Sequence, residues 1–180
     1  MKLFLLLITV FIVISSVYGK NEKFDYKDNT YSYSFTFSTN HHKSIILAVL
    51  YEFDHLKKYS SGISRVRYLG ESGENSYMVE ICLEHLFYAD KSVYKRTIFP
   101  ADGLIKIELK EFKANSSLFP SVTRSCSEYK VFDNGEKTTV LYRQTVSFNK
   151  GLNRVYLKII KNRLDRFADD LIGYVARQEN

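Results

Sequence analysis

The spacing of apolar side chains alternates between two residues and three or four residues along the chain, and this change predicts its strands and helices. Residues 31–38 alternate aromatic and hydroxyl side chains, which is typical of a half-buried strand. Apolar residues then recur at helical spacing over 45–56, with Asn40 as a candidate N-cap, and residues 60–62 end this segment. A final helical spacing over 152–175 predicts one long amphipathic helix.

Between the two helical segments, a period of two predicts six strands joined by short connections. The strands cover residues 63–69, 76–88, 92–99, 104–112, 119–132 and 137–148. Short connections favour an antiparallel sheet with one buried face, and the terminal helix is the natural cover for that face. The predicted fold class is therefore α+β: a strand, a helical segment, six strands and a long helix.

The first 19 residues are typical of a secretory signal peptide. Lys2 precedes an apolar run over residues 3–13, and the small residues Val17 and Gly19 favour cleavage after Gly19. A transmembrane anchor is the alternative, but the run is shorter than the ~20 residues that span a bilayer. We therefore expect an exported protein, periplasmic or extracellular, with a flexible leader over 20–30 and a single domain over 31–177.

The charge and composition narrow the choice of partners. The chain has 26 basic and 20 acidic residues, interspersed along its length. It lacks a dense basic stripe with stacking aromatics, so no nucleic-acid partner is expected, while transient contact with a membrane surface stays open. The 14 Tyr and 13 Phe, with no Trp, suit sheets and apolar cavities.

The order of elements resembles the START-like helix-grip (SRPBCC) superfamily, which includes polyketide cyclase/dehydrase-type proteins, pollen-allergen-type carriers and START lipid-transfer domains. Residues 46–59 resemble its first helices, 63–70 its second strand and 139–143 its last strand. The resemblance implies a curved seven-stranded antiparallel sheet gripping the C-terminal helix around an apolar cavity. It also implies that Cys82 and Cys126 lie on strands that are not neighbours. Two cysteines in an oxidising compartment often pair, but this placement argues against a disulfide.

The candidate cavity residues are those on the strand and helix faces that we expect to point inward. They are Tyr77, Val79, Ile81, Leu83, His85, Phe87, Tyr94, Arg96, Tyr142, Gln144, Ile160, Leu164 and Phe167. His85 is either a hydrogen-bonded core histidine or a group that orients a ligand or transfers a proton. Arg96 is either a polar contact in the cavity or a surface strand residue.

No catalytic residue, metal site or cofactor is predicted, because the sequence has no nucleophile motif, no metal-ligand spacing and no glycine-rich phosphate loop. The leading hypothesis is binding or carriage of a hydrophobic small molecule or lipid. The alternatives are a cyclase/dehydrase-type enzyme that uses His85 and a tyrosine on an apolar substrate, and an interaction module without a cavity. A lipocalin would serve the leading function too, but the early helix and the lack of Trp count against that fold.

Overall fold

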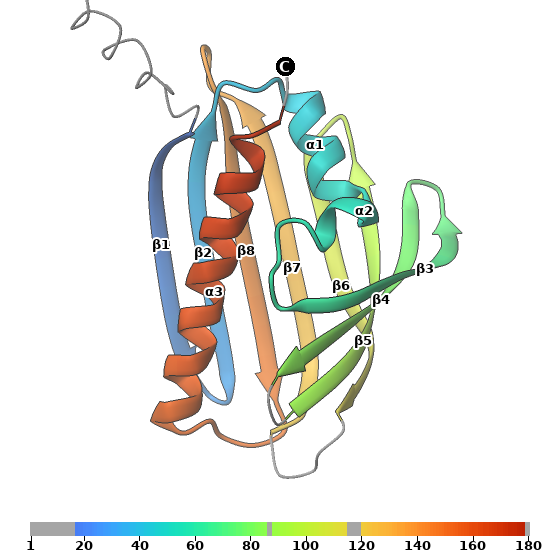
Figure 1. Ribbon diagram of the computed structural model, residues 1–180, viewed down its shortest axis with the longest axis vertical. Helices are drawn as coiled ribbons and strands as arrows, with labels where there is room; N and C mark the ends of the chain where they lie inside the picture. The colour runs from blue at the N-terminus through green and yellow to red at the C-terminus, as the bar shows by residue number, and fades with distance from the viewer. Residues whose placement is uncertain (1–16, 86–87, 115–119, 179–180) are drawn as a thin grey trace, which may run out of the picture.

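Eight antiparallel strands form one curved sheet, and three helices lie on its concave face (Figure 1). The computed structural model describes residues 17–85, 88–114 and 120–178. The strands follow the order β1-β2-β8-β7-β6-β5-β4-β3, so β2 pairs with β8 and every other pair is consecutive in sequence. The α+β helix-grip architecture that the sequence predicts is confirmed, with one strand more than expected.

The bounds of the elements lie within about four residues of those that the sequence predicts, and the largest difference is the additional strand at the N-terminus. The strands are β1 (Val17–Lys27), β2 (Thr30–Thr39), β3 (Ile63–Gly73), β4 (Ser76–His85), β5 (Tyr88–Phe99), β6 (Leu104–Ala114), β7 (Val122–Asp133) and β8 (Thr138–Phe148). The helices are α1 (Lys43–Tyr51), α2 (Phe53–Leu56) and α3 (Arg154–Val175).

The core lies between the concave face of the sheet and the three helices. Every second residue of β2 from Tyr31 to Phe37 is buried, as the alternation of aromatic and hydroxyl side chains predicts. The inward residues Val79 of β4, Val131 of β7 and Val140 of β8 are fully buried as well. The helix α3 crosses this face, and its buried residues Leu171 and Val175 belong to the same core cluster as the inward residues of β2 (Figure 1).

The prediction of a flexible leader over residues 20–30 is wrong, because residues 20–27 belong to β1, which pairs with β2 along most of its length. Glu22, Phe24 and Tyr26 are half-buried and alternate with exposed residues, so the period of two is present among polar neighbours. Asp28 and Asn29 both have positive φ angles, 50° and 60°, which is the conformation of a two-residue type I′ hairpin turn. This hairpin adds the eighth strand to the expected seven.

Local structure differs from the sequence prediction at the first helical segment. The N-cap of α1 is His42 rather than Asn40, because the imidazole Nδ1 accepts a hydrogen bond of 3.3 Å from the backbone N–H of Ser44. Glu52 has an extended backbone and divides the expected helix into α1 and α2. Cys82 on β4 and Cys126 on β7 are free thiols, separated by β5 and β6.

Candidate functional site

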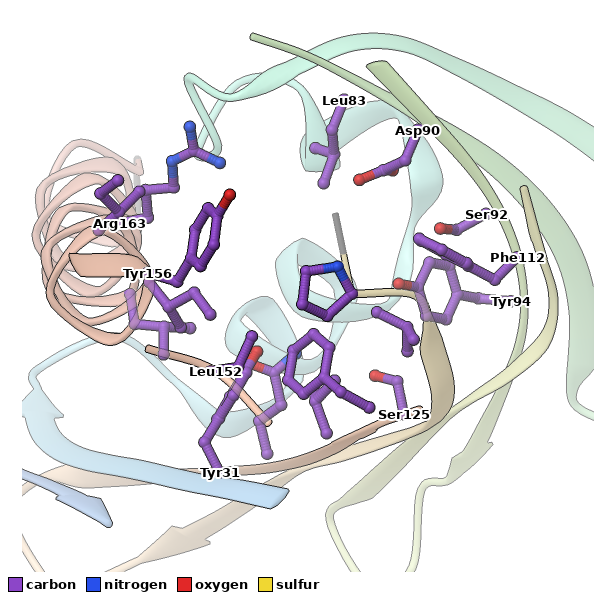
Figure 2. A pocket seen from close by; sticks show the side chains of 18 residues that line it. Tyr31, Leu83, Asp90, Ser92, Tyr94, Phe112, Ser125, Leu152, Tyr156 and Arg163 are labelled. Carbon is purple, nitrogen blue, oxygen red and sulfur yellow. The ribbon is translucent and has the colours of Figure 1, made fainter. Parts of the chain in front are cut away.

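A cavity of about 510 Å³ lies between the N-terminal half of α3 and the concave face of the sheet (Figure 2). One wall is the apolar face of α3, including Ile160 and Leu164, together with Leu152 just before the helix. Val146 and Phe148 of β8 lie on the sheet side of the cavity. The cavity is partly open to solvent, and most of its lining is apolar. These are the features of pockets that hold hydrophobic small molecules.

The hollow lies at this end of the fold because the inward side chains become smaller along the strands. On β5 the inward residues run from Arg96 and Tyr94 to Ser92, and on β7 they run from Tyr129 to Ser125. The large side chains pack beneath α1 and α2, which cover that half of the concave face. No described helix other than α3 covers the half with the serines, so the space there is not filled.

Hydroxyl and amide groups give the cavity wall a few polar contacts. The Tyr31 hydroxyl donates a hydrogen bond of 3.3 Å to Oε1 of Gln144. Burial raises the pKa of Tyr94 above its ordinary value, while hydrogen bonds to Ser92 and Ser125 act in the opposite direction. Tyr94 therefore stays a neutral hydroxyl with partners of its own, and this part of the wall is polar without being charged.

Asp90 is the exception, because its carboxylate has an atom with no partner. Its Oδ1 is buried, and among the described residues it has no hydrogen-bond partner. Burial raises the pKa of Asp90 to about 6, while the positive charge of Arg163 acts to lower it. In Figure 2, Arg163 and Tyr156 extend from α3 on one side of the cavity and Asp90 lies on the other. A buried acceptor without a donor destabilises the empty state, and a ligand with a donor would relieve this cost.

The structure divides the predicted cavity residues into three groups. Leu83, Tyr94, Gln144, Ile160 and Leu164 line the cavity. The residues that pack in the filled core or against it are Tyr77, Val79, Ile81, Arg96, Tyr142 and Phe167. His85 is a residue of β4 whose side chain lies outside the description, and Phe87 is outside the described residues altogether. The role of the lining residues in ligand binding stays a prediction.

Arg96 lies in the buried core, so it is not a surface strand residue, and it is not among the residues that line the cavity. Its side chain is buried, and Nη2 donates a hydrogen bond to the backbone carbonyl of Leu50 at the end of α1. The neighbouring hydroxyl of Tyr77 donates to the carbonyl of Tyr51. Both inward side chains thus bind a helix end that lies directly above them, and this contact keeps them out of the cavity.

Sequence reasoning missed several lining residues, for two different reasons. Asp90 and Ser92 belong to β5, but the expected strand began only at residue 92, so Asp90 was not assigned to a face. Residue type alone does not distinguish Ser125, Tyr156 and Arg163 from side chains at the surface. The usable signal was the run of small inward residues on β5 and β7, which indicates where a sheet face leaves space.

Two features are absent from the described part of the chain. No helix within it is long and apolar enough to cross a membrane. No group of three or more His, Cys, Asp or Glu side chains within it is arranged to hold a metal ion.

No protein-family model and no curated protein sequence matches the chain. Several solved structures match its fold. An aromatase/cyclase from Streptomyces sp. R1128 is 14% identical, with 82% of this chain and 94% of that chain covered and a TM-score of 0.66. A START-superfamily protein from Mycobacterium smegmatis is 15% identical, covering 80% and 96%, with a TM-score of 0.63. The human StarD13 lipid transfer and protein localization domain is 9% identical, covering 84% of each chain, with a TM-score of 0.56. The chain therefore has the START-like helix-grip fold.

Proposed function

We propose that the protein binds or carries a hydrophobic small molecule or lipid in the cavity between the sheet and α3, and that it does so outside the cytoplasm. The observation that carries this proposal is the apolar cavity of about 510 Å³, which is within the range of small-molecule sites. The same space does not fit an interaction module without a cavity. Export rests on the predicted signal peptide over residues 1–19.

The lining supports a ligand with an apolar body and one polar end. Ile160, Leu164 and Val146 offer apolar surface, and burial of a ligand against them contributes about 25 cal/mol for each Å² removed from water. Asp90 offers an acceptor that the described residues leave without a donor. A ligand with a hydroxyl or amine group at that end would satisfy this acceptor. Two of the matched structures are described as a START-superfamily protein and a lipid transfer domain, which agrees with such a ligand.

Thermal shift against a panel of fatty acids, long-chain alcohols and phospholipids tests the proposal. A ligand that binds the native state must raise the Tm with its concentration. Ile160→Trp places a large ring in the cavity and should abolish the shift, whereas Asn162→Trp changes an exposed position of the same helix and should retain it. Flat curves across the panel, or equal shifts in both variants, would contradict binding at this site.

A second candidate function is a cyclase/dehydrase-type enzyme acting on an apolar substrate, and Asp90 is the observation that favours it. A buried carboxyl group whose pKa is raised to about 6 can accept and return a proton near neutral pH. Incubation of an apolar β-hydroxy ketone with the protein tests this candidate by mass spectrometry. Loss of one water by wild type, but not by Asp90→Asn, would support catalysis, and an unchanged mass would leave the carrier as the only proposal.

A further inference from the structure

In the first half of α3 and the turn before it, every charged side chain is basic. Residues 150–164 carry the basic side chains of Lys150, Arg154, Lys158, Lys161 and Arg163 and contain no Asp or Glu. The acidic residues of the helix follow afterwards, in residues 165–170. The positive charge is therefore concentrated on the half of α3 that lines the cavity.

Two apolar side chains are exposed within this basic half. Val155 is 66% exposed, which is the highest value for any large hydrophobic side chain in the described residues. Ile159 follows one turn later, is 42% exposed and also lines the cavity. The exposed apolar surface thus continues directly into the cavity wall. Lone exposed apolar residues are common, but a pair among cations at a cavity mouth is typical of surfaces that contact lipid.

The cations beside this pair are available to a partner. Lys161 is engaged at 2.7 Å by Asp165 and also lies near Glu22, on the flank of α3 that faces β1. Arg154 and Lys158 are exposed, and within the described residues neither forms an ion pair. Their charge is not neutralised by the fold, so an anionic partner gains the full interaction.

We propose that Lys150, Arg154, Val155, Lys158 and Ile159, here called the docking surface, bind an anionic lipid bilayer and hold the cavity mouth against it. This inference rests on the proposed function, because a carrier of apolar ligands must exchange them with a lipid phase. Each Lys or Arg near an anionic leaflet contributes about 1 kcal/mol, and exposed apolar side chains add contact with the acyl boundary. A second copy of the chain fits poorly, since two basic surfaces repel each other.

Sedimentation with vesicles tests the docking surface. Wild type should bind vesicles of phosphatidylcholine with phosphatidylserine, should bind phosphatidylcholine alone far more weakly, and should lose binding as salt is raised. Arg154→Glu with Lys158→Glu should reduce binding to the anionic vesicles at least tenfold. The matched control is Lys113→Glu with Arg124→Glu, which changes the charge equally at exposed positions of β6 and β7 and should bind almost as well as wild type.

Further variants separate this inference from ligand binding in the cavity. Val155→Ser should weaken vesicle binding several-fold and leave the thermal shift with soluble ligand unchanged, because Val155 does not line the cavity. Ile160→Trp should abolish the thermal shift with soluble ligand and leave vesicle binding unchanged. Equal sedimentation with both kinds of vesicle, or equal losses in the charge variant and its control, would overturn the proposal. A concentration-dependent dimer that the Arg154 and Lys158 changes abolish would also overturn it, in favour of a protein interface.

Discussion

Arg96 on β5 donates a hydrogen bond from its buried guanidinium to the carbonyl of Leu50 in the last turn of α1. The final carbonyls of a helix have no partner within the helix and carry a partial negative charge, so a cation there is favourable. The Tyr77 hydroxyl binds the next carbonyl, that of Tyr51. These contacts fix α1 over one half of the concave face and leave the other half to the cavity.

Arg96→Met should lower the free energy of unfolding by about 2 kcal/mol, because it leaves the buried Leu50 carbonyl without its donor. Urea denaturation followed by circular dichroism measures this change. The matched control is Arg124→Met on β7, where the arginine is exposed, and we expect a change within about 0.5 kcal/mol. Equal midpoints for the two variants would show that the Arg96 contact does not stabilise α1.

Phe167→Asp should destabilise the fold by several kcal/mol, because it places a charge among aromatic rings. The Phe167 ring lies 5.4 Å from that of Tyr142 and 6.0 Å from that of Phe35, measured between ring centroids. Arg166→Asp, at the exposed neighbouring position, is the control and should leave the Tm almost unchanged. A Tm for Phe167→Asp within two or so degrees of wild type would contradict the packing of α3 on β2 and β8.

Asp90→Asn should stabilise the protein above pH 6 and make little difference near pH 4. Burial raises the pKa of Asp90 in the folded state to about 6, from an ordinary value of 3.8. The stability that the neutral carboxyl contributes is therefore complete below pH 3.8 and is lost as the pH rises through 6. The Tm difference between variant and wild type, measured from pH 4 to 7.5, should grow up to about pH 6 and then level off.

Asp25→Asn, which changes an exposed carboxylate on β1, is the comparison for this pH series. A Tm difference for Asp90→Asn that is constant with pH, or that shrinks as the pH rises, would show that Asp90 is not desolvated in the cavity.

The exported protein should begin at or near Lys20, because Val17 and Gly19 precede the expected cleavage point. Cleavage there would leave the part of β1 from Asn21 to Lys27, which pairs continuously with β2. N-terminal sequencing of the protein from the medium or periplasm measures this directly. Recovery of residues 3–13 in the exported form would contradict the signal peptide.

The sequence predicts the faces of this sheet better than it predicts position along them. Tyr77 and Leu83 share the inward face of β4, yet Tyr77 packs under α1 and only Leu83 lines the cavity. Periodicity assigns a side chain to one face of the sheet. The point along that face at which a covering helix ends depends instead on tertiary contacts, such as the hydrogen bond from Arg96 to the carbonyl of Leu50. The sequence does not predict β1, because Glu22 and its polar neighbours make the alternation of buried and exposed residues hard to recognise. Asp90 escaped prediction because it lies within two residues of a strand boundary, where sequence patterns are least informative.

The most direct test of the central claim is mass spectrometry of an organic extract of the natively purified protein. We predict that wild type and Asn162→Trp each release an apolar compound in amounts that approach one molecule per chain. Ile160→Trp, with its cavity filled, should release almost none while retaining its folded circular dichroism spectrum. Equal recovery of the compound from folded Ile160→Trp, or extracts without any apolar compound combined with no binding to added lipid, would contradict ligand carriage in this cavity.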